Sequence, residues 1–105
     1  MFVLQIEHEV FEFESWKKAF DNDPAGRKEM GVNQYEIFCL AENSNYVIIN
    51  LWFEDFDQAE NSIMHLRRLW DGDGGRVMKN PQTRILDMMD WKFLEKTETA
   101  VGFPS

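Results

Sequence analysis

The chain has 105 residues, 44% of them hydrophobic, which is enough for one compact domain and too little for two. Acidic residues outnumber basic ones by nineteen to eleven, and the formal net charge of -8 disfavours nucleic acid or an anionic membrane surface as a partner. Cys39 is the single cysteine, so the chain cannot form an internal disulfide. A reducing, cytoplasmic location is therefore expected.

Apolar residues alternate from the start of the chain, without the basic and apolar regions of a signal peptide. The apolar runs are also far shorter than the roughly 18 residues that a membrane span requires. We therefore expect one domain over residues 1–105, with no membrane span and a loosely held tail from about residue 96.

The first half of the sequence predicts a strand, two helices and a second strand. Residues 2–10 alternate with the period of a half-buried strand. A helix ending near Asn22 follows, with aromatic residues on one face at positions Phe13, Trp16 and Phe20. Asp23 and Pro24 predict the start of a short helix over 24–30, which Gly31 ends. Residues 32–40 alternate again as a strand.

The second half predicts a hairpin, a long helix and a final strand. The polar cluster 42–45 predicts the loop before a strand over 46–53. The long helix closes at Gly72, and its apolar face contains Ala59, Ile63, Leu66 and Trp70. Loop residues then occur at 71–75 and at Asn80-Pro81, and residues 85–93 are predicted as the last strand.

This order predicts an α+β fold, a ferredoxin-like βαββαβ sandwich in which both long helices cover one face of a four-stranded antiparallel sheet. The face away from the helices should then be polar. The strand at 46–53 instead has large apolar residues on both parities, as does the last strand. We therefore expect a homodimer that forms through the sheet faces.

Nearly the whole chain resembles the dimeric α+β barrel superfamily, within which it is similar to small proteins near the antibiotic biosynthesis monooxygenase and cyclase-like domains. The resemblance rests on this architecture together with Ile6-Glu7-His8-Glu9-Val10, Trp16-Lys17-Lys18-Ala19-Phe20-Asp21 and Asp23-Pro24-Ala25-Gly26-Arg27-Lys28. It implies a homodimer whose two sheets close a barrel, with a small-molecule pocket between sheet and helices in each subunit.

Two kinds of site in this superfamily give different expectations. Haem-degrading members use an asparagine, a tryptophan and a histidine. Here the first strand has no asparagine and His65 precedes Trp70, so that site is not expected. Cofactor-free monooxygenase members hold polycyclic aromatics with Asn, Trp and Tyr side chains, which Asn50, Trp52 and Tyr35 loosely match. No cofactor and no metal site are therefore expected.

His8 is the first candidate for catalysis, because an imidazole near the end of a central strand can act as a general base. The assumed topology gathers His8 at one end of the sheet with Tyr46, Arg67, Trp70 and Arg84. In this arrangement Arg84 would face developing negative charge on an anionic or phenolic ligand. The alternatives are a structural histidine and arginines that form surface ion pairs.

The aromatic residues Trp16, Phe20, Trp52 and Trp70 can line a pocket for a flat ligand or can pack as ordinary core. The segments beginning at Asp21 and Asp71 resemble calcium loops but lack the bidentate acid at the twelfth position. The second of these could instead form a turn over the pocket mouth. The basic pairs Lys17-Lys18 and Arg27-Lys28 fit solvated helix faces.

Two functions remain open from the sequence. The first is an enzyme resembling cofactor-independent monooxygenases or cyclases that act on an aromatic or polyketide-like substrate, with His8 as base. The second is a non-catalytic homodimeric module that binds the same ligand without converting it.

Overall fold

The computed structural model describes residues 1–72 and 79–94. Its elements follow the predicted order: β1 (Phe2–Glu9), α1 (Phe13–Asp21), α2 (Arg27–Met30), β2 (Gln34–Leu40), β3 (Asn43–Phe53), α3 (Phe56–Asp71) and β4 (Lys79–Asp87). The predicted tail and most of the 71–75 turn lie outside the described residues. No helix in the described part is long and apolar enough to cross a membrane.

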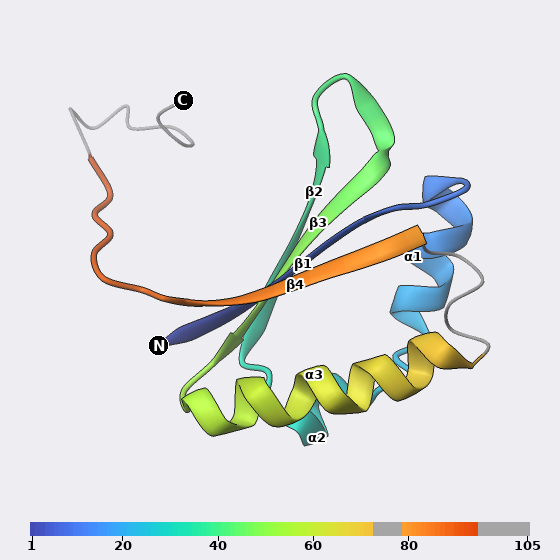
Figure 1. Ribbon diagram of the computed structural model, residues 1–105. Helices are drawn as coiled ribbons and strands as arrows, with labels where there is room; N and C mark the ends of the chain where they lie inside the picture. Colours follow the sequence, from blue (N-terminus) through green and yellow to red (C-terminus); the bar gives the residue numbers. More distant parts are fainter. Residues whose placement is uncertain (73–78, 95–105) are drawn as a thin grey trace.

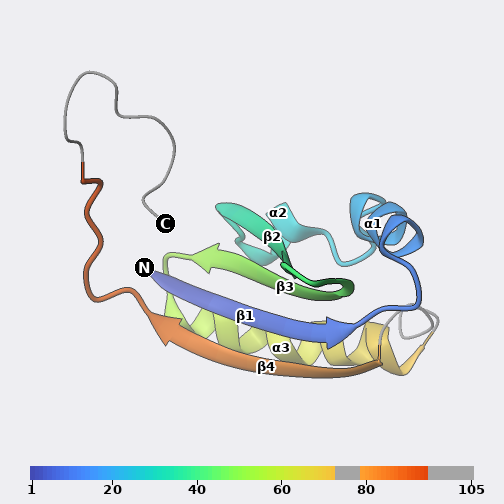
Figure 2. The ribbon, with the colours of Figure 1, turned by 90° about the horizontal axis from the view of Figure 1, so that it is seen from above.

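The strands form one four-stranded antiparallel sheet in the order β2-β3-β1-β4. Helix α3 runs beneath the sheet (Figure 1), and α1 and α2 lie toward its β2 side (Figure 2). The helices cover a single face, so the predicted ferredoxin-like α+β fold is confirmed. The central strand β1 is therefore flanked by β3 and β4 and packs on the helices through alternate residues.

Most of the core lies between the sheet and the helices. On β1 the even-numbered positions Leu4, Ile6 and His8 are buried on this face, and on β3 the odd-numbered positions from Val47 to Phe53 join them. The antiparallel register pairs Leu4 with Leu51 and Ile6 with Ile49, which places these side chains on the same face. Ala59 and Leu66 of α3 complete the contact from below.

The predicted position of the last strand is wrong. Strand β4 covers Lys79–Asp87 and not 85–93, because β1 begins at Phe2 and its last partner in the ladder is Asp87. Asn80 and Pro81, which were predicted as loop, lie in the strand. The ladder shifts register between Glu7 and Glu9 of β1, and Asn80 has a φ of 50° there, which marks a β-bulge in an edge strand.

Two smaller predictions also need correction. Strand β3 begins at Asn43, so most of the predicted 42–45 loop belongs to a strand with an irregular start, where the Asn43 side chain accepts the Asn45 N–H at 3.0 Å. Helix α2 begins at Arg27, three residues later than predicted. The preceding Gly26 has a φ of 70°, a left-handed conformation that is incompatible with a continuous helix from Pro24.

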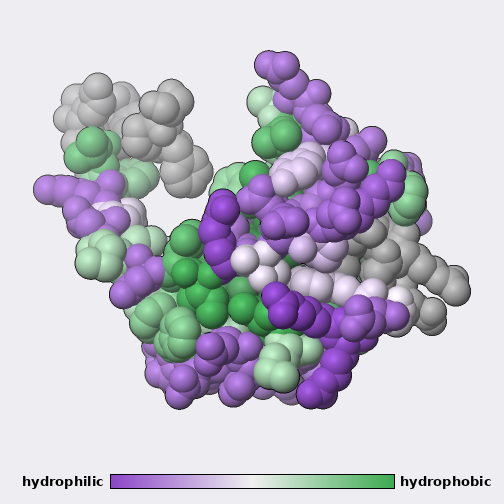
Figure 3. All heavy atoms as spheres, viewed as in Figure 1, coloured by the Kyte–Doolittle hydropathy of each residue, from purple (hydrophilic) through white to green (hydrophobic). Residues whose placement is uncertain are grey.

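The sheet face away from the helices has no cover within the described chain. It exposes large apolar side chains, including Phe38 and Leu40 of β2 and Leu86 of β4. Figure 3 shows hydrophobic atoms gathered above α3, between the mostly hydrophilic hairpin tip and the hydrophilic outer surface of the helix. Beyond β4 the chain runs away from the molecule (Figure 1), and there Met89 is 84% exposed and Trp91 is 70% exposed.

Candidate functional site

His8 is buried at the end of β1, on the face covered by the helices. It is 1% exposed and is one of the four largest fully buried side chains of the described residues. Its Nδ1 lies 3.1 Å from the carbonyl oxygen of Glu9. Because a carbonyl oxygen only accepts hydrogen bonds, Nδ1 carries the hydrogen and Nε2 is the basic nitrogen of the neutral ring.

Burial favours the neutral form of this imidazole. Removal from water lowers the pKa of His8 below its usual value of 6.5, and the hydrogen bond to Glu9 offsets only part of this effect. Within residues 1–72 and 79–94, the Nδ1 contact with Glu9 is the only hydrogen bond of the His8 ring. Nε2 is thus the nitrogen that could accept a proton from a molecule in the adjoining cavity.

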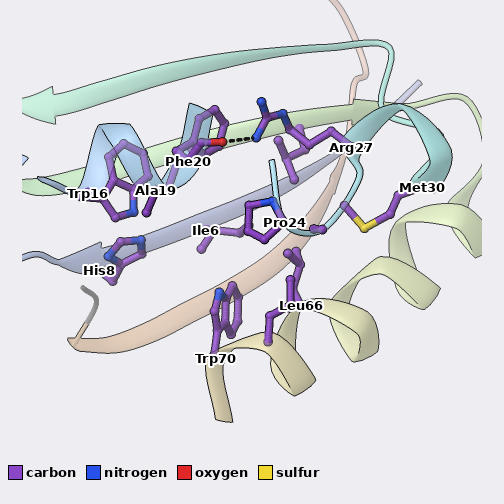
Figure 4. A pocket seen from close by; sticks show the side chains of 14 residues that line it. Ile6, His8, Trp16, Ala19, Phe20, Pro24, Arg27, Met30, Leu66 and Trp70 are labelled. Atoms are coloured by element: carbon purple, nitrogen blue, oxygen red, sulfur yellow. Dashed lines mark hydrogen bonds between the residues drawn. The ribbon is translucent and has the colours of Figure 1, made fainter. Parts of the chain in front are cut away.

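A cavity of about 110 Å³ adjoins His8, between the sheet and all three helices (Figure 4). The side chains that line it are almost entirely apolar. They are Ile6, His8, Trp16, Ala19, Phe20, Pro24, Ala25, Arg27, Met30, Ile49, Leu51, Leu66, Leu69 and Trp70. The cavity is comparable in size to an engineered apolar cavity of about 150 Å³ that holds one benzene ring.

Aromatic side chains of α1 form one wall of the cavity. Trp16 stacks on Phe20 with ring centroids 5.2 Å apart, and it meets the His8 ring edge-on at 5.8 Å. Ala19 lies on the same helical face as Trp16, and its methyl group does not fill the space between the large rings. The spacing of large and small residues therefore helps to account for the cavity.

Arg27 supplies a positive charge to the opposite part of the lining. Its guanidinium lies 4.0 Å above the centroid of the Phe20 ring and 5.0 Å from that of Tyr35. Nη1 donates a hydrogen bond of 2.8 Å to the Phe20 carbonyl (Figure 4) and lies 3.4 Å from Asp23. The sequence placed Arg27 on a solvated helix face, yet its side chain is only 18% exposed.

The structure brings together four of the side chains expected in the site. His8, Trp16, Phe20 and Trp70 all line the cavity. Tyr35 does not line it, but its ring packs edge-on against Phe20 at 5.0 Å. Arg67 is exposed on α3 and does not line the cavity.

The other four expected side chains lie on the opposite face of the sheet. Tyr46, Asn50 and Arg84 belong to one hydrogen-bonded network there, and Trp52 donates separately to Glu36 at 2.8 Å. Arg84 donates to Gln5 at 2.8 Å and to Glu7 at 3.2 Å. It was expected beside His8 because β4 was predicted to start near residue 85. In the observed register Arg84 pairs with Gln5, three residues before His8.

Tyr46 is the second residue with a perturbed pKa. Its hydroxyl donates to Glu7 at 2.6 Å, and this hydrogen bond is the main cause that raises the pKa of Tyr46 above 10.0. The phenol therefore remains protonated at neutral pH. It lies across the sheet from the cavity, so it cannot act on the same bound molecule within one chain.

Several lining residues were not singled out from the sequence. Leu66 was placed on the correct helical face, but only as core. Met30 and Leu51 carried no signal that separates a cavity wall from ordinary packing. The small residues Ala19, Pro24 and Ala25 are the detectable signal, because small side chains among the large aromatic ones of this part of the chain leave volume unfilled.

The site offers acid-base chemistry in an apolar surrounding. Within residues 1–72 and 79–94, no three His, Cys, Asp or Glu side chains lie close enough to hold a metal ion. The cavity combines apolar walls, one neutral imidazole and one guanidinium. Such an arrangement can bind a small aromatic molecule and can remove a proton from it.

Comparisons with known proteins support the fold. No protein-family model matches the sequence. No curated protein is significantly similar to it. A solved antibiotic biosynthesis monooxygenase has 8% identity over 86% of this chain and 100% of its own, with a TM-score of 0.62. SnoaB from Streptomyces nogalater, a cofactor-independent oxygenase, has 9% identity over 93% of this chain and 96% of its own, with a TM-score of 0.62.

A third solved structure is a dimeric ferredoxin-like protein from an uncultured marine organism. It has 12% identity over 86% of this chain and 97% of its own, with a TM-score of 0.60. These structures share one architecture. The chain thus has the ferredoxin-like fold of antibiotic biosynthesis monooxygenase-like structures.

Proposed function

We propose that this protein is a small-molecule enzyme that resembles cofactor-independent oxygenases or cyclases and removes a proton from an aromatic substrate. The observation that supports this function best is the position of His8. A fully buried, neutral imidazole adjoins an apolar cavity, with one ring nitrogen fixed by the Glu9 carbonyl and the other not hydrogen-bonded by residues 1–72 or 79–94. His8 is the general base in this proposal.

The tautomer of His8 determines which ring nitrogen acts as the base. The Glu9 carbonyl accepts the Nδ1 hydrogen and holds the ring, so Nε2 takes the proton from the substrate. The lowered pKa keeps Nε2 free of a proton at neutral pH, although it also makes the nitrogen a weaker base. An enolic or phenolic group is acidic enough for such a base, and the resulting anion is the species that reacts with dioxygen or closes a ring.

The cavity walls set the size of the proposed substrate. Trp16, Phe20 and Trp70 offer ring faces and edges for stacking, and the volume of about 110 Å³ accommodates one aromatic ring. A polyketide-like molecule with several rings would extend beyond this cavity. Arg84 has no part in this step, because it lies on the other face of the sheet.

The proposal is tested with phenylacetone, which has one ring and weakly acidic hydrogens beside a carbonyl group. In deuterated buffer the protein should accelerate exchange of these hydrogens, as measured by NMR. The substitution His8→Asn should abolish the acceleration, because the Asn amide can still donate to the Glu9 carbonyl but offers no base. His65→Asn is the matched control, since the other histidine is exposed on α3 and does not line the cavity.

The outcomes separate the two functions that the sequence left open. His8-dependent exchange supports the enzyme. Binding of phenylacetone without exchange supports the non-catalytic module, which is favoured by the absence of a second acid or base among the residues that line the cavity. Exchange that persists in the His8→Asn variant contradicts the proposed role of His8.

We also propose that the protein acts as a homodimer through the sheet face that the helices do not cover. A neighbour of the same fold is described as dimeric, and this face exposes Phe38, Leu40 and Leu86. The exposed Met89 and Trp91 lie on a segment that has no cover from the described part of its own chain. Apolar area of this kind is typical of an interface.

The dimer is tested by light scattering during size-exclusion chromatography. Phe38→Glu should convert the dimer to a single chain. A carboxylate without a partner, buried in the interface, destabilises the dimer by about 3 kcal/mol or more. Met64→Glu introduces the same charge at an exposed apolar residue of α3 and should leave the dimer intact. A wild-type protein that elutes as a single chain at micromolar concentration would rule out the dimer.

A further inference from the structure

Arg27 is the only charged residue among those that line the cavity in the described part of the chain. Its charge lies in an apolar surrounding, where electrostatic interactions are stronger than in water. The protein as a whole carries a net charge of -8, so an anionic ligand gains nothing from long-range attraction. Any preference of the cavity for an anionic ligand must therefore come from the positive charge of Arg27.

The contacts of Arg27 divide its hydrogen-bond donors into two groups. Nη1 is occupied, since it donates to the Phe20 carbonyl at 2.8 Å and lies 3.4 Å from Asp23. Nε and Nη2 form no hydrogen bond with residues 1–72 or 79–94. These two nitrogens are neighbours on one edge of the planar guanidinium, and that edge matches the two oxygens of a carboxylate.

The surroundings of Arg27 hold the guanidinium in place. The guanidinium carbon lies 4.0 Å from the centroid of the Phe20 ring and 5.0 Å from that of Tyr35, so both rings restrict the movement of the cation. The Asp23 carboxylate approaches the guanidinium only at Nη1, and its Oδ1 also accepts the backbone N–H of Arg27 at 2.9 Å, so it does not engage the Nε–Nη2 edge. A side chain fixed in this way loses little conformational entropy when a ligand binds.

We infer that Arg27 determines ligand specificity by binding a carboxylate, and that the cavity takes single-ring aromatic carboxylic acids. This inference rests on the proposed function of the cavity and adds the substrate class. The ring occupies the space between Trp16, Phe20 and Trp70, and the carboxylate meets the Nε–Nη2 edge of Arg27. A phenolic hydroxyl on the side of the ring opposite the carboxylate then points toward His8, on the other part of the lining.

The experiment compares phenylacetate with phenylacetamide, which have the same outline but differ in charge. Binding is measured by tryptophan fluorescence and by isothermal calorimetry at neutral pH. Phenylacetate should bind the wild-type protein at least about tenfold more tightly, the range expected for charge-assisted hydrogen bonds. Arg27→Gln should reduce this preference to within about twofold.

Two further variants sharpen the result. Lys28→Gln removes the same charge from an exposed neighbour on α2 that does not line the cavity, and it should leave the preference unchanged. Arg27→Lys keeps the charge but loses the two-pronged edge, so it should keep only part of the preference. If Arg27→Gln fails to fold, the preference of Arg27→Lys for phenylacetate over phenylacetamide tests the inference instead. An unchanged preference in Arg27→Lys overturns the inference.

The two proposals can fail separately. Equal affinity of the wild-type protein for the acid and the amide overturns the carboxylate inference. His8-dependent exchange of phenylacetone, a neutral molecule of the same outline, would leave the proposed function standing in that case. Loss of preference in Lys28→Gln as well as in Arg27→Gln would assign the effect to overall charge and would also overturn the inference.

Discussion

The two faces of the sheet use the same strands for different purposes. The face toward the helices is apolar apart from His8, and it is closed except for the cavity. The opposite face joins Gln5, Glu7 and Arg84 with residues of β3 by hydrogen bonds, and apolar side chains surround this network. Alternation along β1 therefore separates a buried base from an exposed polar network by single residue steps.

The largest expected difference between the faces is in packing energy. Leu4→Ala on the helix side removes a fully buried side chain and should lower the free energy of unfolding by about 2–5 kcal/mol. Leu86→Ala makes the same change on the opposite face, where the residue is 39% exposed, and should cost about 0.5 kcal/mol in an isolated chain. Urea denaturation measures both.

A loss of unfolding free energy well above about 0.5 kcal/mol for Leu86→Ala would indicate that the face opposite the helices is covered. If the opposite face is covered by a second chain, the cost of Leu86→Ala should grow with protein concentration, because unfolding is then coupled to dissociation. Equal costs for the two variants at every concentration would contradict the assignment of Leu4 and Leu86 to different environments.

The next largest effect is a pH dependence of stability that arises from His8, on the sheet face toward the helices. The folded state lowers the pKa of His8 below 6.5, so the unfolded chain binds a proton that the folded chain excludes. Stability should therefore be unaffected by His8 above pH 6.5 and should fall as the pH decreases below it. The slope from this residue is at most about 1.4 kcal/mol per pH unit.

Comparison with a variant isolates this contribution from other titrating groups. His8→Asn should remove the His8 part of the slope, so the difference in unfolding free energy between wild type and variant should shrink as the pH falls below 6.5. Urea denaturation at several pH values measures the difference. A constant difference across this range would mean that His8 titrates normally.

The smallest effect is expected on the opposite face. Arg84→Gln removes the ion pair with Glu7, but the arginine side chain is 61% exposed, so the pair is well screened by water. The loss of stability should be about 0.5 kcal/mol and should vanish in high salt. A cost above about 2 kcal/mol would show that this network is buried, as it would be beneath a second chain.

Much of the fold could be predicted because its signals are local. The alternation along β1 and the aromatic face of α1 define the buried side of each element without knowledge of any other element. The same periodicity put Trp16 and Phe20 on one helix face and Trp70 on the apolar face of another helix, and the structure brings all three together with His8 around the cavity. The four-stranded antiparallel sheet followed from the order of the elements along the chain.

Predictions that depend on partners in space were less successful. The apolar residues Met89 and Trp91 favoured a late final strand, but the ladder ends where β1 begins. This error moved Arg84 to the end of the sheet beside His8, whereas it pairs with Gln5 in the middle of β1 and lies on the opposite face. Arg27 was missed for a similar reason, since nothing local distinguishes an arginine on a solvated helix from one that folds back over Phe20.

The irregularity at Asn80 and Pro81 also bears on how copies of this protein meet. Strand β4 is at the border of the sheet, where unpaired backbone groups could recruit another strand and start open-ended aggregation. A bulge that contains a proline disrupts the straight row of donors and acceptors that such growth requires. Self-association by lengthening the sheet is thus discouraged at this border, and a finite assembly is favoured over a fibre.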